Sequence, residues 1–137
     1  MTPFLEAQVH ALSGLGEGTP SPEARARLLG VGLSGGAIFR QAGASLRALL
    51  RRRIEARFPD HAIVGEEYGL KESAGASHRW YIDPIDGTKS FVHGVPIYGV
   101  LLALEIDGEV AVGVANFPAL NEMVAAADGL GCWWNGR

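Results

Sequence analysis

The stretch that most constrains this chain is an apolar run that stops abruptly on charged residues. The run Trp80–Ile82 has the character of a buried strand, and Asp-Pro-Ile-Asp-Gly-Thr follows it at positions 83–88. An unpaired carboxylate in a dry site costs on the order of several kcal/mol. The proline fixes one backbone angle between Asp83 and Asp86, and Gly87 allows close approach of a ligand. We expect a tight turn that aims both carboxylates at one cation; a ligand-free Asx turn is the alternative.

A second apolar run, His61–Val64, leads into Gly65-Glu66-Glu67-Tyr68-Gly69. The spacing between Glu66 and Asp83 allows a loop and a second strand beside the first, so both acidic groups would end neighbouring strands. Carboxylates this close repel each other unless a dication lies among them. Oxygen donors without Cys or His suit Mg²⁺ or Mn²⁺ rather than zinc.

These motifs resemble a known family. Ile82-Asp-Pro-Ile-Asp-Gly-Thr-Lys-Ser-Phe91, the upstream Gly-Glu-Glu and the terminal Gly131-Cys-Trp-Trp-Asn-Gly136 resemble the inositol monophosphatase family of Mg²⁺-dependent phosphatases. The resemblance is dense from about Ile54 to Arg137. Within the family, Ser90-Phe91 and the following Gly-Val-Pro are more similar to the histidinol-phosphatase branch.

The resemblance implies hydrolysis of a small phosphate monoester, histidinol phosphate or inositol monophosphate. It implies metal ligation by Glu66, Asp83, the Ile85 carbonyl and Asp86, with Asp83 shared between two ions. Substrate phosphate would lie against Ile85 and Asp86 and accept hydrogen bonds from the backbone of Gly87 and Thr88. The catalytic set implied in this way is Glu66, Asp83, Asp86 and Thr88.

The chain departs from the family pattern in two places. The resemblance implies an aspartate near position 43 that pairs with Thr88, whereas the sequence there reads Ala42-Gly43-Ala44, and residues 35–45 lack the Thr-x-x-Asp pattern. Family members also continue well beyond the matching region. The alternative hypothesis is therefore a truncated, catalytically impaired chain that binds metal or phosphate without turnover.

Composition excludes several other classes. A length of 137 residues suits one domain or part of one, and a net charge of −3 predicts neither a nucleic-acid nor a membrane partner. The single cysteine, Cys132, excludes an internal disulfide. No signal-peptide pattern is present, and the longest apolar run, Val95–Leu104, is too short for a bilayer. We expect a cytoplasmic protein.

Residues 1–45 read as a divergent, Gly/Pro-rich segment preceding the N-terminal part of a phosphatase domain at 46–137. Gly30-Val-Gly-Leu-Ser-Gly35 matches a dinucleotide-binding fingerprint, but no strand is expected before it, so a flexible loop is the favoured interpretation.

A helix is expected from Ser45 to Pro59, with an apolar stripe at three- and four-residue intervals: Leu46, Leu49, Leu50, Ile54 and Phe58. Arginines cover much of the remaining surface: Arg47, Arg51, Arg52, Arg53 and Arg57. A phosphate-binding face is one interpretation of these arginines, and a solvated face is the favoured one.

The rest of the chain predicts a meander of strands over residues 97–106, 109–117, 122–127 and 131–134. Asp107-Gly108 between two apolar runs is a strong hairpin signal. The predicted fold class is α+β, a helical region on an antiparallel sheet, and the resemblance implies the first half of a layered α/β sandwich. Exposed hairpin edges make a homodimer possible.

Overall fold

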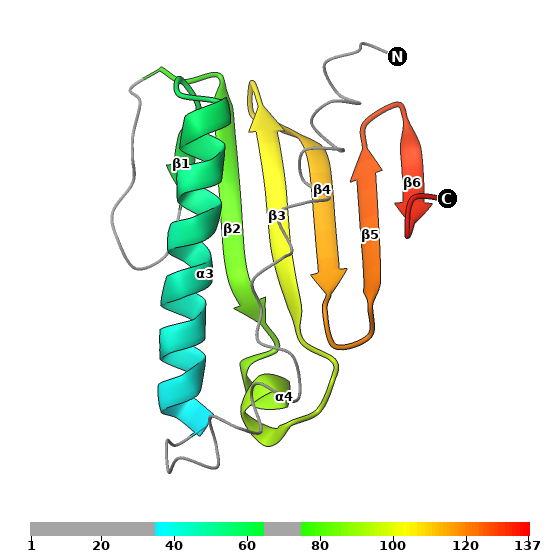
Figure 1. Cartoon of the computed structure of the whole chain (residues 1–137). Coiled ribbons are helices and arrows are strands. Elements are labelled where there is room, and N and C mark those ends of the chain that lie inside the picture. The colour runs from blue at the N-terminus through cyan, green and yellow to red at the C-terminus, as the bar shows by residue number, and fades with distance from the viewer. Residues whose placement is uncertain (1–34, 65–74) are drawn as a thin grey trace.

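The computed structural model describes residues 35–64 and 75–137, so the expectations for the N-terminal loop, for positions 30–34 of the fingerprint and for Glu66 lie outside the described residues. Two helices and six strands follow one another along the described chain (Figure 1): α3 (Gly35–Arg57), β1 (Ala62–Val64), β2 (His78–Asp86), α4 (Thr88–His93), β3 (Gly99–Ile106), β4 (Glu109–Phe117), β5 (Glu122–Ala127) and β6 (Gly131–Trp134).

The six strands form one sheet in sequence order, and the predicted α+β class is confirmed. Strands β2 to β6 are antiparallel, but β1 pairs with β2 in parallel, so the sheet is mixed rather than antiparallel as expected. A parallel pair needs a long connection, which residues 65–77 supply. Val64, the last residue of β1, lies opposite Tyr81, so both strands run toward the end of the sheet that carries Asp83.

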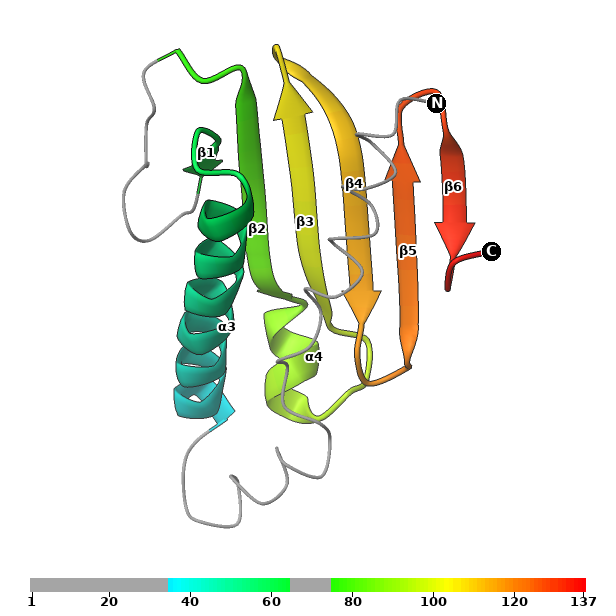
Figure 2. The same cartoon turned by 45° about the horizontal axis from the view of Figure 1, so that its top comes forward.

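Helix α3 lies across one face of the sheet beside β1 and β2 (Figures 1 and 2). It begins at Gly35 and runs without a break through residue 45, so the expected start at Ser45 is wrong. The division of the chain at that residue stays a prediction. Among the described residues, neither helix combines the length and the hydrophobicity needed to cross a membrane.

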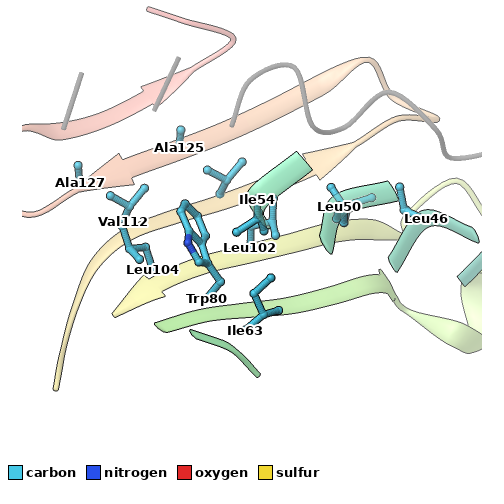
Figure 3. Packing of buried hydrophobic residues seen from close by; sticks show 12 residues of the cluster. Leu46, Leu50, Ile54, Ile63, Trp80, Leu102, Leu104, Val112, Ala125 and Ala127 are labelled. Carbon is cyan, nitrogen blue, oxygen red and sulfur yellow. The ribbon is translucent and has the colours of Figure 1, made fainter. Parts of the chain in front are cut away.

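The predicted apolar stripe of α3 forms the helical half of the core. Its buried side chains interlock with one face of the sheet (Figure 3). Trp80, fully buried, lies at the centre of this layer. The buried cluster consists of Leu46, Leu50, Ile54, Ile63, Trp80, Val100, Leu102, Leu104, Val112, Val114, Ala125 and Ala127. The core therefore fixes α3 against β2, and this contact positions the residues discussed below.

The Asp107-Gly108 hairpin is confirmed. Both residues have positive φ, 52° and 90°, which a two-residue type I′ turn requires. The strands at 109–117, 122–127 and 131–134 have the expected bounds, whereas β3 begins at Gly99 rather than Ile97. The short helix α4 was not expected from the sequence.

The indole of Trp80 has its polar partner at the edge of the core. Trp80 Nε1 donates a hydrogen bond to His61 Nδ1 at 2.9 Å, so His61 must be neutral at that nitrogen. The imidazole also stacks on His78, with ring centroids 4.4 Å apart. Burial, and then the neighbouring His78, lower the pKa of His61 below its usual 6.5, while Asp60 acts in the opposite direction.

We expect the free energy of unfolding to fall as the pH drops below about 6.5, where the unfolded chain protonates His61 while the folded chain resists it. Above that pH the contribution is fully present. Urea unfolding followed by Trp fluorescence between pH 5 and 8 measures this slope. His61→Asn keeps a side-chain acceptor and does not titrate, so its slope should be shallower; an equal slope in both proteins would contradict the assignment.

Candidate active site

A cavity of about 510 Å³ lies where β2 ends, between that strand end and α3. The β2 side contributes a continuous segment from Asp83 to Thr88, and the α3 side contributes Phe39, Arg40, Gly43, Ala44 and Arg47. In Figure 1 the arrowhead of β2, the start of α3 and α4 lie at the same end of the sheet. A volume of this size can hold a small organic ligand.

The aspartates lie on a bulge within β2, not in the turn expected from the sequence. The pairing with β3 shifts between Asp83, opposite Leu101, and Asp86, opposite Gly99. Pro84 and Ile85 are buried, which leaves both aspartates exposed on the cavity side of the strand end. The Ile85 N–H donates to Asp83 Oδ1 at 3.1 Å. This is the local bond of the Asx alternative, and it orients the carboxylate without closing the cavity.

Gly87 connects the strand to α4 through a conformation that suits glycine. It has φ 80° and ψ 43°, in the left-handed region. A Cβ at this position would lie 3.1 Å from the Ile97 carbonyl oxygen and 3.3 Å from Tyr98 Cα. Both neighbours are backbone atoms, which cannot shift without cost, so a side chain at position 87 would be strained. Glycine at this position allows the turn that puts Thr88 in the cavity wall.

Gly87→Ala is expected to destabilise the protein by about 2 kcal/mol or more, because left-handed strain adds to the backbone contact. Chemical denaturation measures this change. Gly108→Ala is the matched control: Gly108 also has positive φ, 90°, but a Cβ there has nothing within 4 Å. If the free energy of unfolding falls by the same amount in both variants, the close backbone contact at Gly87 does not contribute to stability.

Helix α4 is held by a second small core. Phe91 is fully buried, and its ring makes edge-type contacts with Tyr98, at a centroid distance of 5.0 Å, and with Phe39 of α3, at 6.0 Å. Ile85 completes the buried set. The same cluster thus joins the strand end, α4 and the beginning of α3, which fixes the cavity walls relative to one another.

The structure brings five of the six predicted site residues into one wall: Asp83, Ile85, Asp86, Gly87 and Thr88. Glu66 lies outside the described residues, and within 35–64 and 75–137 no three acidic, His or Cys residues gather as a metal cluster. The roles of these residues as ligands stay predictions. His93 is exposed, and its Nδ1 lies 2.8 Å from the Lys89 carbonyl oxygen.

The sequence analysis missed the cavity wall on α3. Arg47 was expected on a solvated face, yet it is half-buried and lines the cavity, with Nε shielded from solvent. Its position beside Leu46 and three residues before Leu50 puts it at the margin of the apolar stripe, which is the signal that could have identified it. Gly43 is buried in the same wall.

The sequence and the fold of this chain are similar to those of known proteins. The model of the inositol monophosphatase family matches residues 25–137. A histidinol-phosphatase of Chlorobaculum parvum is 49% identical over 96 residues, 70% of this chain and 37% of its own. An inositol-1-monophosphatase of Rhizobium meliloti is 31% identical over 135 residues, 98% of this chain and 51% of its own. The crystal structure of the extragenic suppressor protein suhB from Bartonella henselae superposes with a TM-score of 0.79 at 25% identity, covering 96% of this chain and 52% of that one.

The fold and the strand-end cavity define the class: an α+β chain with an acidic site at the end of a mixed sheet. The chain belongs to the inositol monophosphatase family, as the sequence resemblance predicted. It spans about half or less of the length of the curated relatives described above.

Proposed function

We propose that this chain carries the metal and phosphate site of a Mg²⁺-dependent phosphate monoesterase. The observation that supports it best is that one cavity is lined by two aspartates, by Ile85 at the end of β2, and by the Gly87-Thr88 segment. Carboxylates suit a hard cation, and backbone N–H groups suit an anion. A phosphate monoester that binds together with a metal ion would therefore suit both sets of groups: the carboxylates would bind the metal, and the N–H groups would bind the phosphate.

The described residues fit a magnesium site. Asp83 and Asp86 line one cavity, are exposed to it, and offer only oxygen donors. The proposed ligands are these two carboxylates, the Ile85 carbonyl and Glu66, with Mn²⁺ as an acceptable substitute. The hydrogen bond from the Ile85 N–H orients one oxygen of Asp83, which is the kind of support that metal-ligating carboxylates have.

When bound, the metal would offset phosphate charge and lower the pKa of a water molecule. The chain's own groups would do the rest. The N–H groups of the first turn of α4 cannot bond within the helix, so those of Thr88 and its neighbours can donate to phosphate oxygens. The Thr88 hydroxyl can hold a water beside the phosphate, and the packed cluster around Phe91 keeps this segment from shifting.

For the substrate we propose histidinol phosphate first and inositol monophosphate second. A histidinol-phosphatase is 49% identical over 96 residues, whereas relatives whose names include inositol-1-monophosphatase range from 31% over 135 residues to 48% over 80 residues, so identity favours the first substrate by a small margin. Ser90-Phe91, directly after the phosphate segment, supports the same order. Because the chain covers only part of these relatives, the activity of the whole protein is part of the proposal.

A second candidate function is binding of metal and phosphate without turnover. Gly43 lines the cavity near the position where the family resemblance implies an aspartate, and the described α3 wall contributes no carboxylate. A site of this kind would bind its ligands but activate water poorly.

The deciding experiment is metal-dependent phosphate release from histidinol phosphate and inositol monophosphate by the purified chain, with Asp86→Asn as the inactive control. Turnover on the order of 1–10³ s⁻¹ that the control abolishes would establish the phosphatase. Metal-dependent thermal stabilisation without release would favour the binding function. The absence of both phosphate release and thermal stabilisation would contradict both functions.

A further inference from the structure

Two arginines face the strand-end cavity from α3. Arg40, Gly43 and Arg47 are spaced so that they follow one stripe of the helix, and all three line the cavity opposite Asp83 and Asp86. The small residues Gly43 and Ala44 lie between the two arginines along the helix, so the α3 wall combines two cationic side chains with two small residues.

Arg47 has the surroundings of a binding residue rather than of a surface charge. It is half-buried, with Nε shielded from solvent, whereas Arg52 on the same helix is exposed. It also lines a neighbouring cavity of about 320 Å³, which shares Asp83 and Pro84 with the first. Arg47 therefore lines both cavities, together with Asp83 and Pro84 at the acidic end of β2.

The charges of this wall favour an anion together with a cation. The guanidinium groups of Arg40 and Arg47 offset the carboxylates of Asp83 and Asp86, so a dication bound by the carboxylates would leave a net positive charge among the described wall residues. A phosphate dianion neutralises that charge. Arginine is suited to this task, because its planar group can donate two parallel hydrogen bonds to phosphate oxygens and keeps its charge at any physiological pH.

We propose that Arg47 is a phosphate-binding residue of this site, with Arg40 attracting the anion from the more exposed rim. The inference rests on the proposed function, and it adds a protein cation on α3 to the backbone N–H groups of the Gly87-Thr88 segment. Phosphate would then be held from both walls of the cavity, by the strand end and by the helix.

The test uses inorganic phosphate as the probe, in saturating Mn²⁺, with binding measured by calorimetry. Arg47→Met keeps the length of the apolar stem and should weaken phosphate binding by about 10- to 100-fold. Arg47→Lys keeps the charge but not the fork and should lose less. Arg40→Met should lose about two- to fivefold, as expected for an exposed charge. Arg52→Met, on the same helix, is the matched control and should bind like the parent.

A second measurement separates phosphate binding from support of the aspartates. Mn²⁺ affinity, measured by electron paramagnetic resonance without phosphate, should change less than about threefold in Arg47→Met, whose fold is checked by Trp fluorescence and circular dichroism. If Arg47→Met binds phosphate as the parent does, or if its Mn²⁺ affinity rises while phosphate affinity stays the same, the inference is overturned. A parent chain that binds no phosphate also overturns it.

The outcome is separable from that of the proposed function. Phosphate binding that depends on Arg47, without hydrolysis of either monoester, supports the inference and leaves only the binding function. Hydrolysis that Asp86→Asn abolishes, with phosphate binding independent of Arg47, supports the phosphatase and rejects the inference.

Discussion

Gly43→Asp is expected to raise metal-dependent phosphate release by about 10²- to 10⁴-fold, the range that a positioned acid–base group contributes. Gly43 is buried in the α3 wall of the cavity that Thr88 also lines, and a Cβ there would meet only Ile85 Cδ1, at 3.9 Å, which is an ordinary contact. A Cβ at position 43 therefore fits without displacing the strand end. The family resemblance implies that an aspartate at this position pairs with Thr88 and helps to activate water.

The matched variant is Gly43→Asn, which has the same shape and no charge. The aspartate should also lower the stability of the metal-free protein, because a third carboxylate would repel Asp83 and Asp86, and added Mn²⁺ should reverse this loss. Release assays at saturating metal and thermal melts with and without metal provide both readouts. Equal release by the aspartate and asparagine variants would show that a carboxylate at position 43 has no role in the chemistry.

Asp83→Asn is the second change with a large expected effect. It should weaken Mn²⁺ binding by at least the roughly 10- to 100-fold that losing a supporting group of a metal site costs, and it should abolish stabilisation by millimolar Mg²⁺. Asparagine keeps an oxygen that can accept the Ile85 N–H, so the bulge of β2 should survive and only the charge is lost. Thermal melts across a metal titration give the affinity in each protein.

Asp107→Asn serves as the control for this charge removal. Asp107 lies in the β3–β4 hairpin with φ 52°, a conformation that asparagine tolerates well. Its metal-dependent melting shift should equal that of the parent. If Asp83→Asn keeps the full shift, the metal is not bound by the end of β2, and the proposed site is wrong.

Much of the fold follows from local patterns in the sequence. The type I′ turn at Asp107-Gly108 and the apolar runs on either side of it define the β3–β4 hairpin with nearly the observed bounds, because these signals act within a few residues. The stripe of α3 likewise identifies Leu46, Leu50 and Ile54 as core residues. The acidic segment at 83–88 identifies one wall of the cavity.

Other features depend on contacts between distant segments. The parallel pairing of β1 with β2 could not be predicted, since the same short apolar run could pair in either direction. Helix α4 contains Thr, Ser, Phe, Val and His, which are mediocre helix formers; the burial of Phe91 against Tyr98 and Phe39 stabilises it instead.

The acidic strand end, the hairpins and the helix that covers the core can be predicted from local sequence, because each depends on periodicity or turn chemistry over a short span. That Gly43 and Arg47 line the cavity at this strand end follows from the packing of α3 against β2. Arg47 and Arg52 belong to one run of arginines on one helix, yet the first lines a cavity and the second is exposed. The two arginines differ because a side chain at the margin of an apolar stripe is exposed or buried according to whether another element packs beside it. Here Arg47 lines a cavity together with the bulged end of β2 and is half-buried.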